Sequence, residues 1–424
     1  MSKQHKAGLL IVFITVFIDL LGFGIVLPLL PRYGEHFEAN GWTLGLLMAA
    51  FSAMQFIFAP IWGRVSDKVG RRPILILGLT GSTVFYALFG LATSLGNTGQ
   101  LLGLGTLTWL FISRIGAGIA GATIPTAQAY IADVTGKKDR AKGMALIGAA
   151  FGIGFTFGPL LGAAFVSSEV GGPPSAAPGY VASVLSGIAL LMAIFVLPES
   201  LKADSAASGH GWFNFKAFGN ALTRPTIGLV LLTMFLTTFA FAQFESTLSL
   251  LTGKMGLADQ SNFYVFAYIG LILTISQGFL VRRLVPKIGE YRMSLIGAAL
   301  MMAGLWLIGL AGQNESRALL YCVLPIAVVG FSALNPSLQS LLSLGTPDNE
   351  QGGMLGLGQS MSALARILGP IAGIVLFKGS VALGIEADSM RPYFWAAALM
   401  LVGMGMILPL KNKDSRAIEE PQDA

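Results

Sequence analysis

Four charged side chains interrupt long apolar stretches of this sequence: Asp19, Arg114, Glu245 and Arg366. A charge inside a membrane segment costs roughly 2.5 to 3.5 kcal/mol on insertion scales, so its presence usually reflects a function. Carboxylates bind and release protons, while guanidinium groups hold carboxylates or attract anions. The four residues therefore predict proton binding coupled to the movement of a solute.

Asp19 is the leading candidate for the proton site. It lies about 18 Å along an apolar window over residues 7–30, at a rise of 1.5 Å per residue, which is close to the middle of a bilayer. Burial favours the neutral carboxyl and a nearby cation favours the charged one, so an Asp19 that pairs with Arg114 in one conformation only would exchange a proton as the protein rocks. The alternative is a permanent ion pair that never titrates.

The other two charges have more open interpretations. Glu245 lies about 30 Å beyond Pro225 along its helix, where it could act as a second proton site, contact a cationic substrate, or face water at the rim of a cavity. Arg366 could attract an anion, hold Glu245, or bond a backbone carbonyl. Candidate cavity-lining amides are Gln55, Gln243 and Gln359, although buried amides also bond neighbouring helices.

No pattern in the sequence predicts an enzyme, a metal site or a cofactor. The three histidines, His5, His36 and His210, fall in loops or tails, and no nucleophile with its base is recognisable. Residues 116–121 match the glycine spacing of a dinucleotide loop, but they lie inside an apolar helix rather than after a strand, so we expect helix packing there. The single cysteine, Cys322, cannot form an internal disulfide.

The elements that position these residues are predicted to be membrane-spanning helices. With 54% hydrophobic and only 11% charged residues, the chain is far more apolar than a soluble protein. Windows long enough to span a bilayer fall at residues 7–30, 43–62, 73–94, 103–131, 141–166, 179–197, 226–251, 261–281, 293–311, 318–343, 353–377 and 392–410. We therefore predict an all-α membrane protein of twelve transmembrane helices.

The loops between these windows differ strongly in charge. Most of the 27 Lys and Arg residues lie on the side of the N-terminus; those on the opposite side are Arg32, Lys254, Arg317, Lys378 and Arg391. By the positive-inside rule, both termini are predicted to be cytoplasmic, in a multi-pass protein of the inner (plasma) membrane. This bias also explains the net charge of +6, so we expect no nucleic-acid partner.

An internal repeat divides the chain. Gly158-Pro159 and Gly162 of the fifth window recur as Gly369-Pro370 and Gly373 of the eleventh, and a Pro-x-x-Gln motif repeats in the same register. Two pseudo-symmetric six-helix bundles are predicted, with a solute site where they meet. The predicted boundaries are residues 1–197 for the first bundle, 198–225 for a linker with an interfacial helix, 226–410 for the second bundle and 411–424 for a cytoplasmic tail.

A cationic turn joins the second and third windows. It reads GRVSDKVGRR, with Gly63 and Gly70 bracketing Asp67, and Arg71 and Arg72 closing it. Lys and Arg gather in any short cytoplasmic loop, so the glycines and the acid carry the specific information. In the second half the corresponding stretch begins at Gly278 and reaches its glycine, Gly289, late, which indicates an insertion.

These motifs resemble the major facilitator superfamily over nearly the whole chain. The resemblance rests on the turn over residues 63–72 and on helix motifs at residues 19–31, 114–118, 130–133, 154–162 and 198–200. It implies that Asp67 latches the two halves on the cytoplasmic side, at the start of the eleventh helix; the alternative is a solvated acid that balances Lys68 and Arg71. The fifth-helix residues Gly154, Gly158, Pro159 and Gly162 resemble an antiporter motif, in which Ala163 replaces the last glycine.

Within that family the chain is most similar to drug:proton antiporters of the tetracycline-resistance type. That similarity implies export of a small amphipathic molecule by a monomer in exchange for protons. Phe85 stands where such exporters carry an acid in the third helix, and the ninth helix has no acid either, so tetracycline itself is not the expected substrate. Alternatives are a proton-coupled symporter or an organic-anion transporter on the same fold, and a receptor or scaffold that transports nothing.

Overall fold

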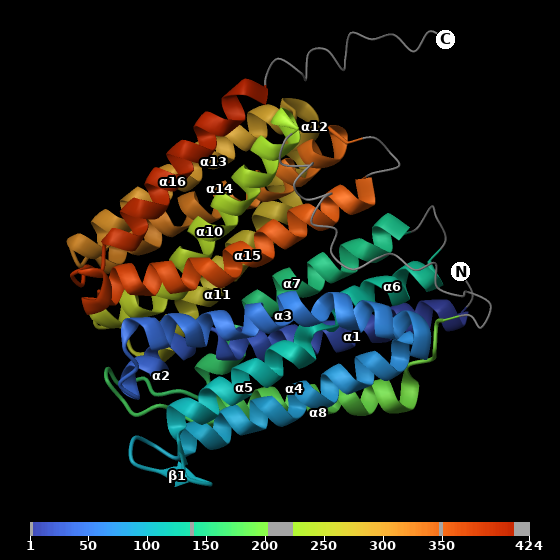
Figure 1. The fold of residues 1–424 in the computed structure, drawn as a ribbon, viewed down its shortest axis with the longest axis horizontal. Helices are drawn as coiled ribbons and strands as arrows, with labels where there is room; N and C mark the ends of the chain where they lie inside the picture. Colours follow the sequence, from blue (N-terminus) through green and yellow to red (C-terminus); the bar gives the residue numbers. More distant parts are fainter. Residues whose placement is uncertain (1–2, 136–139, 202–223, 347–350, 411–424) are drawn as a thin grey trace. The chain divides into compact units, whose positions relative to one another are not determined.

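The computed structural model describes residues 3–135, 140–201, 224–346 and 351–410, and helices make up almost all of them (Figure 1). Before residue 202 they are α1 (Lys3–Val26), α2 (Leu30–His36), α3 (Gly41–Val69), α4 (Arg71–Ser94), α5 (Thr106–Ala120), α6 (Ile124–Val134), α7 (Arg140–Ala163) and α8 (Ala177–Val196). After residue 223 they are α10 (Pro225–Lys254), α11 (Asp259–Ile275), α12 (Arg282–Ile288), α13 (Glu290–Gln313), α14 (Arg317–Leu344), α15 (Gln351–Lys378) and α16 (Arg391–Ile407). Short 3-10 turns, η3 (Val381–Leu383) and η4 (Leu408–Leu410), flank the last helix.

Apolar length along these helices confirms the twelve predicted spans. Among the described residues, eleven segments are long and apolar enough to cross a bilayer, and a shorter apolar helix, Ala149–Ala163, lies within α7. Some spans combine several elements: α1 with α2, α5 with α6 through the 3-10 turn η1 (Gly121–Thr123), and α11 with α12 through the π-helix η2 (Ser276–Val281).

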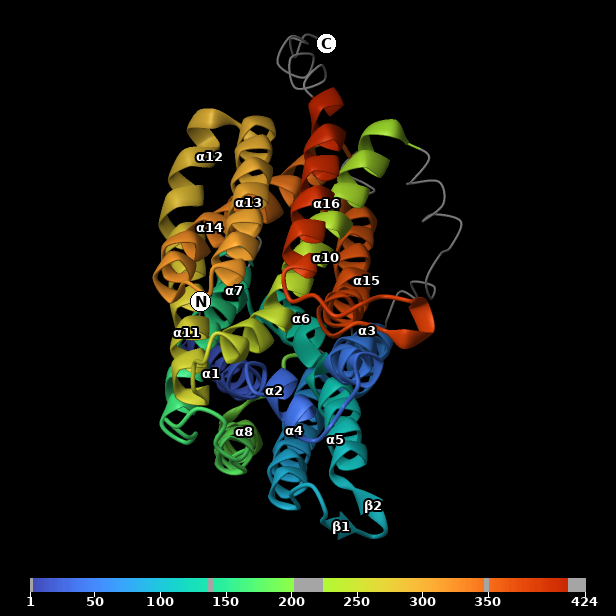
Figure 2. The same ribbon diagram turned by 90° about the vertical axis from the view of Figure 1, so that its left-hand side faces the viewer.

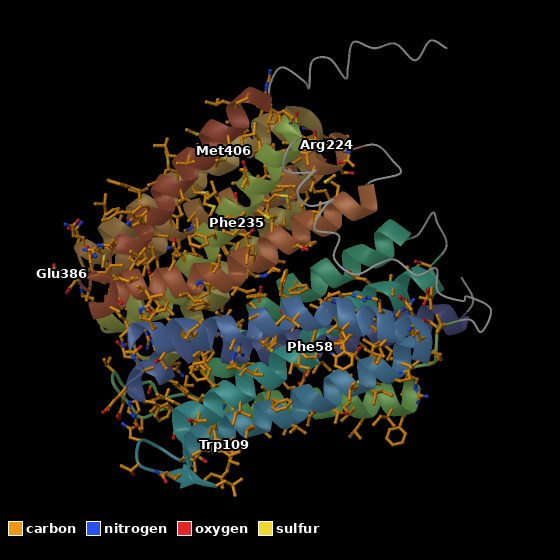
Figure 3. All side chains as sticks on the ribbon, viewed as in Figure 1. Phe58, Trp109, Arg224, Phe235, Glu386 and Met406 are labelled. Carbon is orange, nitrogen blue, oxygen red and sulfur yellow. The ribbon has the colours of Figure 1, made fainter. Side chains whose placement is uncertain are left out.

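A short hairpin precedes α5. Strand β1 (Gln100–Leu101) pairs antiparallel with β2 (Leu104–Gly105), and the positive φ angles of Leu102 and Gly103 form the tight turn between them. The helix predicted from residue 103 therefore begins later, at Thr106. The indole nitrogen of Trp109 donates a 3.0 Å hydrogen bond to the Leu101 carbonyl, which fastens the hairpin to α5 (Figure 3).

The described residues form two compact units. The first contains residues up to 201 together with residues 252–274, and the second contains residues 224–251 and 275–410. The segment 252–274, which begins in the last turn of α10 and continues into α11, thus packs with the first unit. The linker helix predicted within residues 198–225 and the tail predicted at 411–424 lie largely outside the described residues, and the predicted boundaries remain predictions.

In the first unit, α1 packs against α7 and α8, and α4 packs against α5 and α8 (Figure 2). Its core includes the fully buried Val12, Tyr130, Ile131 and Ala189. In the second unit, α13 packs against α14 and α16. A side chain at Gly304 would collide with the backbone of Ala327, so α13 and α14 touch through their backbones. This packing at small residues is typical of membrane helices.

The repeated glycines of α7 and α15 make matching contacts in their own units. A Cβ at Gly158 would come within 2.9 Å of the Leu21 carbonyl of α1. In the second unit, a Cβ at Gly369 would come within 2.9 Å of the Phe239 carbonyl of α10. The first and fifth membrane helices of each half are therefore held together by the same close approach.

The predicted ten-residue turn over 63–72 is reduced to a single residue. α3 continues to Val69 and α4 starts at Arg71, so only Gly70 lies between them, with a φ of 108° that side chains rarely adopt. Gly289, with a φ of 84°, does the same between α12 and α13. The stretch from Gly278 to Gly289 is four residues longer than that from Gly63 to Gly70, and the π-helix η2 overlaps its start.

Candidate functional site

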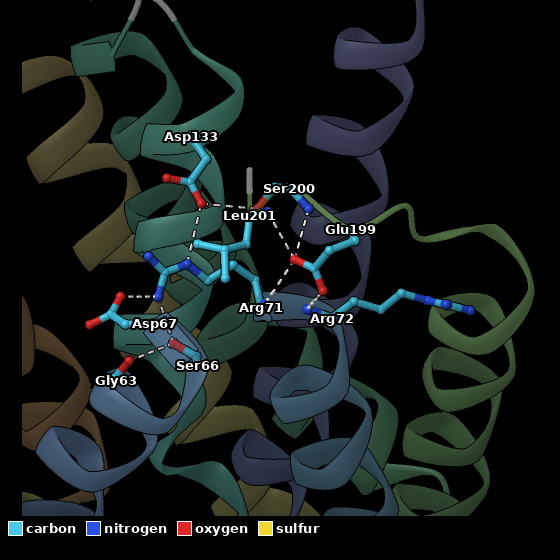
Figure 4. A network of polar contacts seen from close by, with 9 residues as sticks. All are labelled: Gly63, Ser66, Asp67, Arg71, Arg72, Asp133, Glu199, Ser200 and Leu201. Atoms are coloured by element: carbon cyan, nitrogen blue, oxygen red, sulfur yellow. Dashed lines mark hydrogen bonds and ion pairs between the residues drawn. The ribbon is translucent and has the colours of Figure 1, made fainter. Parts of the chain in front are cut away.

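Arg71 is the centre of a polar network in the first unit (Figure 4). Its guanidinium pairs with Asp67 one turn earlier, donates to the Ser66 hydroxyl at 2.8 Å and to the Asp133 carboxylate at 3.2 Å. Ser66 in turn donates to the Gly63 carbonyl at 2.6 Å. The network joins the end of α3, the start of α4 and the end of α6.

Glu199, just after α8, caps the start of α4. Its two carboxylate oxygens accept hydrogen bonds from the backbone amides of Arg71 and Arg72, at 2.9 and 3.1 Å. A negative charge at a helix N-terminus satisfies unpaired N–H groups and complements the helix dipole. The carboxylate also lies where a side chain at residue 70 would be. Glycine is therefore required at this position for two reasons, its positive φ angle and the lack of space for a Cβ atom.

The predicted latch residues are therefore all found in or beside one network within the first unit. Asp67 balances Arg71, as the second interpretation expected, but it is 43% exposed and retains a free outer face. Arg72 donates to the Ile194 carbonyl of α8 at 2.5 Å. A latch to the start of α15 remains a prediction. The roles of Asp133 and Glu199 were not predicted. Each is an acid at the end of a helix, which is visible in the sequence, but the sequence alone does not show that either one contacts Arg71.

Asp19 and Arg114 lie within the first unit but form no ion pair in the described part of the chain. The Arg114 side chain is only 2% exposed, and its guanidinium lies over the ring of Phe51 at 4.6 Å and near that of Phe23 at 6.0 Å. Its Nε and Nη1 atoms have no hydrogen-bond partner. In this conformation the cation is held by aromatic faces rather than by the acid.

The Asp19 carboxylate is bonded on one side only. The Ser82 hydroxyl of α4 hydrogen-bonds it, while its buried Oδ1 atom has no partner. Tyr86 lies close enough to act electrostatically on both Asp19 and Arg114. Because the two side chains are unpaired in this conformation, an ion pair between Asp19 and Arg114 cannot be permanent. One carboxyl oxygen of Asp19 is left without a hydrogen-bond partner.

The antiporter-motif residues lie beside this cluster. Gly154 approaches Leu20, the neighbour of Asp19, and a Cβ at Gly24 would come within 3.5 Å of the Pro159 ring. Gly162, one turn further on, contacts the ring of Phe263 in α11. The motif thus fits α7 closely to α1 at the depth of Asp19.

In the second unit, Glu245 and Arg366 act on each other electrostatically, and they form no direct ion pair in the part of the chain that the structure describes. Glu245 is partly buried and Arg366 is exposed. Gln243 is 1% exposed and its Oε1 atom has no partner, while Gln359 is exposed. In the first unit, Gln55 donates to the Gly121 carbonyl at 3.1 Å, as an amide that bonds a neighbouring helix does.

Comparisons with known proteins bear on the whole chain. A sequence model of the Major Facilitator Superfamily matches residues 12–370. Multidrug resistance protein 2 of Bacillus subtilis (strain 168) is 28% identical over 424 residues, covering 98% of each chain. The class C tetracycline resistance protein of Escherichia coli is 30% identical over 384 residues, covering 89% of this chain and 91% of that protein.

Among solved structures, the human organic anion transporter MFSD10 (TETRAN) matches with a TM-score of 0.68 at 26% identity, over 96% of this chain and 100% of that one. Family model, relatives and fold agree along nearly the full length. The chain therefore belongs to the Major Facilitator Superfamily, a family of membrane transporters.

Proposed function

We propose that this protein is a proton-coupled antiporter of the plasma membrane that exports a small amphipathic compound by alternating access. It works as a monomer with both termini in the cytoplasm, and it needs no cofactor. Asp19 carries the proton, Arg114 responds to its charge, and Glu245 takes part from the second half. The Asp67 network forms the cytoplasmic latch.

The observation that supports this function best is the Asp19 carboxylate. It lies in a membrane helix with one buried oxygen unpartnered. Tyr86 acts electrostatically on this carboxylate and on the buried cation of Arg114, whose guanidinium lies over the ring of Phe51. A buried carboxylate and a buried cation that are unpaired in one conformation can pair in another, and the proton is released when they do. The names of the relatives, multidrug and tetracycline resistance proteins, favour export of an amphipathic compound.

The test is exchange in liposomes. Purified protein in vesicles with an acidic lumen should accumulate members of a panel of amphipathic cations, neutral compounds and organic anions, with only the pH gradient as driving force. Asp19→Asn should abolish accumulation against the gradient while downhill exchange continues. The matched control is Asp388→Asn, which removes an acid from the loop before α16. Full accumulation by Asp19→Asn would refute the proton site.

Organic-anion transport is the second candidate, and it rests on Arg366. Arg366 supplies a cationic group on a membrane helix, and a neighbour in structure is described as an organic anion transporter. Under this function Arg366→Gln should remove uptake of anions such as aryl carboxylates and sulfonates. Uptake confined to cations would exclude it.

A further inference from the structure

A cluster of hydrogen bonds fastens the turn between α10 and α11 to α2. The Nη1 atom of Arg32 donates to the Asp259 carboxylate at 2.7 Å and to the Leu257 carbonyl at 2.9 Å. Its Nη2 atom donates to the Thr252 hydroxyl at 3.0 Å. The two charged side chains are only 12% and 16% exposed, so water screens this ion pair weakly.

Arg32 is itself held firmly on the first half. The neighbouring Tyr33 hydroxyl donates to the Ser175 carbonyl at 2.8 Å and accepts from the Ser175 amide at 2.9 Å. Tyr33 is 1% exposed. This pair of bonds ties α2 to the loop before α8, so Arg32 projects from a fixed support.

A second layer of bonds lies around the ion pair. The buried Thr252 hydroxyl donates to Asn262 at 2.6 Å, and the Asn262 amide donates to the Pro28 carbonyl at 3.2 Å. The Gln260 side chain donates to the Ala163 carbonyl at the end of α7, also at 3.2 Å. The bonds to Pro28 and Ala163 join the segment 252–274 to the first six helices, and the Thr252–Asn262 bond braces the segment itself.

Further along α11 the same segment touches α7 directly. The Thr156 and Thr274 hydroxyls lie 3.3 Å apart, and any side chain at Gly270 would collide with the Phe155 backbone. Beyond Thr274 the helix leaves the first unit, and η2 begins at Ser276. A π-helix interrupts the regular hydrogen-bond ladder, which makes this a natural place for the helix to bend.

We propose that Arg32 is the positioning residue that closes the transport path at the end opposite the termini, by clamping the α10–α11 turn to α2. This inference rests on the alternating access proposed above. For a path to open at this end, a segment that belongs by sequence to the second half must leave the first half. The bonds that cross from this segment to the first six helices break when it does, and the Arg32–Asp259 pair is the one among those described above that joins two charges.

The test measures opening at this end by thiol labelling. In a Cys322→Ser background, Thr156→Cys places a reporter thiol in the α7–α11 contact, where Thr156 is 7% exposed. A membrane-impermeant maleimide is added from the side opposite the termini. Arg32→Gln should raise the labelling rate about tenfold, which corresponds to the loss of roughly one charge-assisted hydrogen bond.

Charge reversal separates a clamp from a merely structural residue. The double substitution Arg32→Asp with Asp259→Arg should return labelling toward the wild-type rate, whereas Arg32→Asp alone should not. Arg391→Gln is the matched control, because it removes an ion pair with Asp388 that is local to the start of α16. Labelling of Arg391→Gln should stay at the wild-type rate.

Equal labelling of Arg32→Gln and wild type, or no recovery in the reversed pair, would overturn the clamp. If Arg32→Gln does not fold, Asp259→Asn gives the same comparison. The labelling needs neither substrate nor a pH gradient, so it stands apart from the proton site. If Asp19→Asn transports like wild type while Arg32→Gln still raises the labelling of the reporter thiol, the proposed function alone is refuted. If Asp19→Asn abolishes accumulation while Arg32→Gln leaves the labelling unchanged, the clamp alone is refuted.

Discussion

The backbone amide of Arg71 donates a 2.9 Å hydrogen bond to the carboxylate of Glu199, 128 residues further along the chain. This bond fixes the start of α4 to the end of α8, and the same carboxylate accepts from Arg72, Ser200 and Leu201. The charged turn after α3 is thus organised by an acid outside it. Two consequences can be measured, one for stability and one for access.

Glu199→Ala should lower the stability of the first unit. It removes a cap from two amides at the start of α4, and loss of such a cap costs about 0.5 to 2 kcal/mol. The midpoint of thermal unfolding in detergent should fall, while Glu169→Ala, in the exposed loop before α8, should leave it unchanged. An unchanged midpoint for Glu199→Ala would show that the cap contributes nothing to stability.

Asp67→Asn should shift the balance between inward and outward accessibility. Asp67 shares Arg71 with Asp133, so the two acids act on one guanidinium and their effects should be coupled. Labelling of single-cysteine reporters from each side should change in Asp67→Asn and in Asp133→Asn, and by less than the sum in the double variant. Strict additivity would mean that the two acids act separately.

Gly158→Ala should impair both folding and exchange. The added methyl group would meet the Leu21 carbonyl and the Gly24 backbone, neither of which can move without shifting α1, and such overpacking costs typically 1 to 3 kcal/mol. Gly405→Ala is the matched control, because nothing lies within 4 Å of the new methyl group in α16. The unfolding midpoint and the exchange rate should fall in Gly158→Ala and stay at the wild-type values in Gly405→Ala. Wild-type values for Gly158→Ala would disprove the close fit.

Arg114→Lys should slow exchange although it keeps the charge. Only a planar guanidinium can lie flat over Phe51 as Arg114 does, and such contacts contribute about 0.5 to 2 kcal/mol. A several-fold lower rate of pH-driven uptake is expected, with Arg292→Lys on the surface of α13 as the control. Equal rates for the two lysine variants would mean that the aromatic support is irrelevant.

The apolar windows predicted the helices well because a membrane span has a fixed length and excludes charges. The second window ended too early and the third began slightly too late, since α3 continues through the charged residues to Val69, α4 starts at Arg71, and only Gly70 breaks the helix. The late position of Gly289 could be seen in the sequence, but the π-helix that overlaps the start of this stretch could not. Length and composition determine where a helix crosses, and backbone detail determines how it ends.

The candidate site was predicted in part. The charges at Asp19 and Arg114 were visible as interruptions of apolar sequence, but the aromatic support of Arg114 depends on rings from α1 and α3 that any core could contain. Arg32 and Asp259 looked like ordinary loop charges, 227 residues apart. Nothing local pairs them, since the bond arises only from the way α11 packs.

The matching contacts of Gly158 and Gly369 also reveal what the two halves do not share. If Gly24 is aligned with Ala242 through these contacts, Thr237 stands where the first half has Asp19, and Leu27 stands where the second half has Glu245. The scaffold is repeated, but its ionisable groups are not. A carboxylate site at Asp19 therefore has no counterpart in the second half, and one at Glu245 has none in the first, so the repeated frame carries two different polar sites rather than two copies of one.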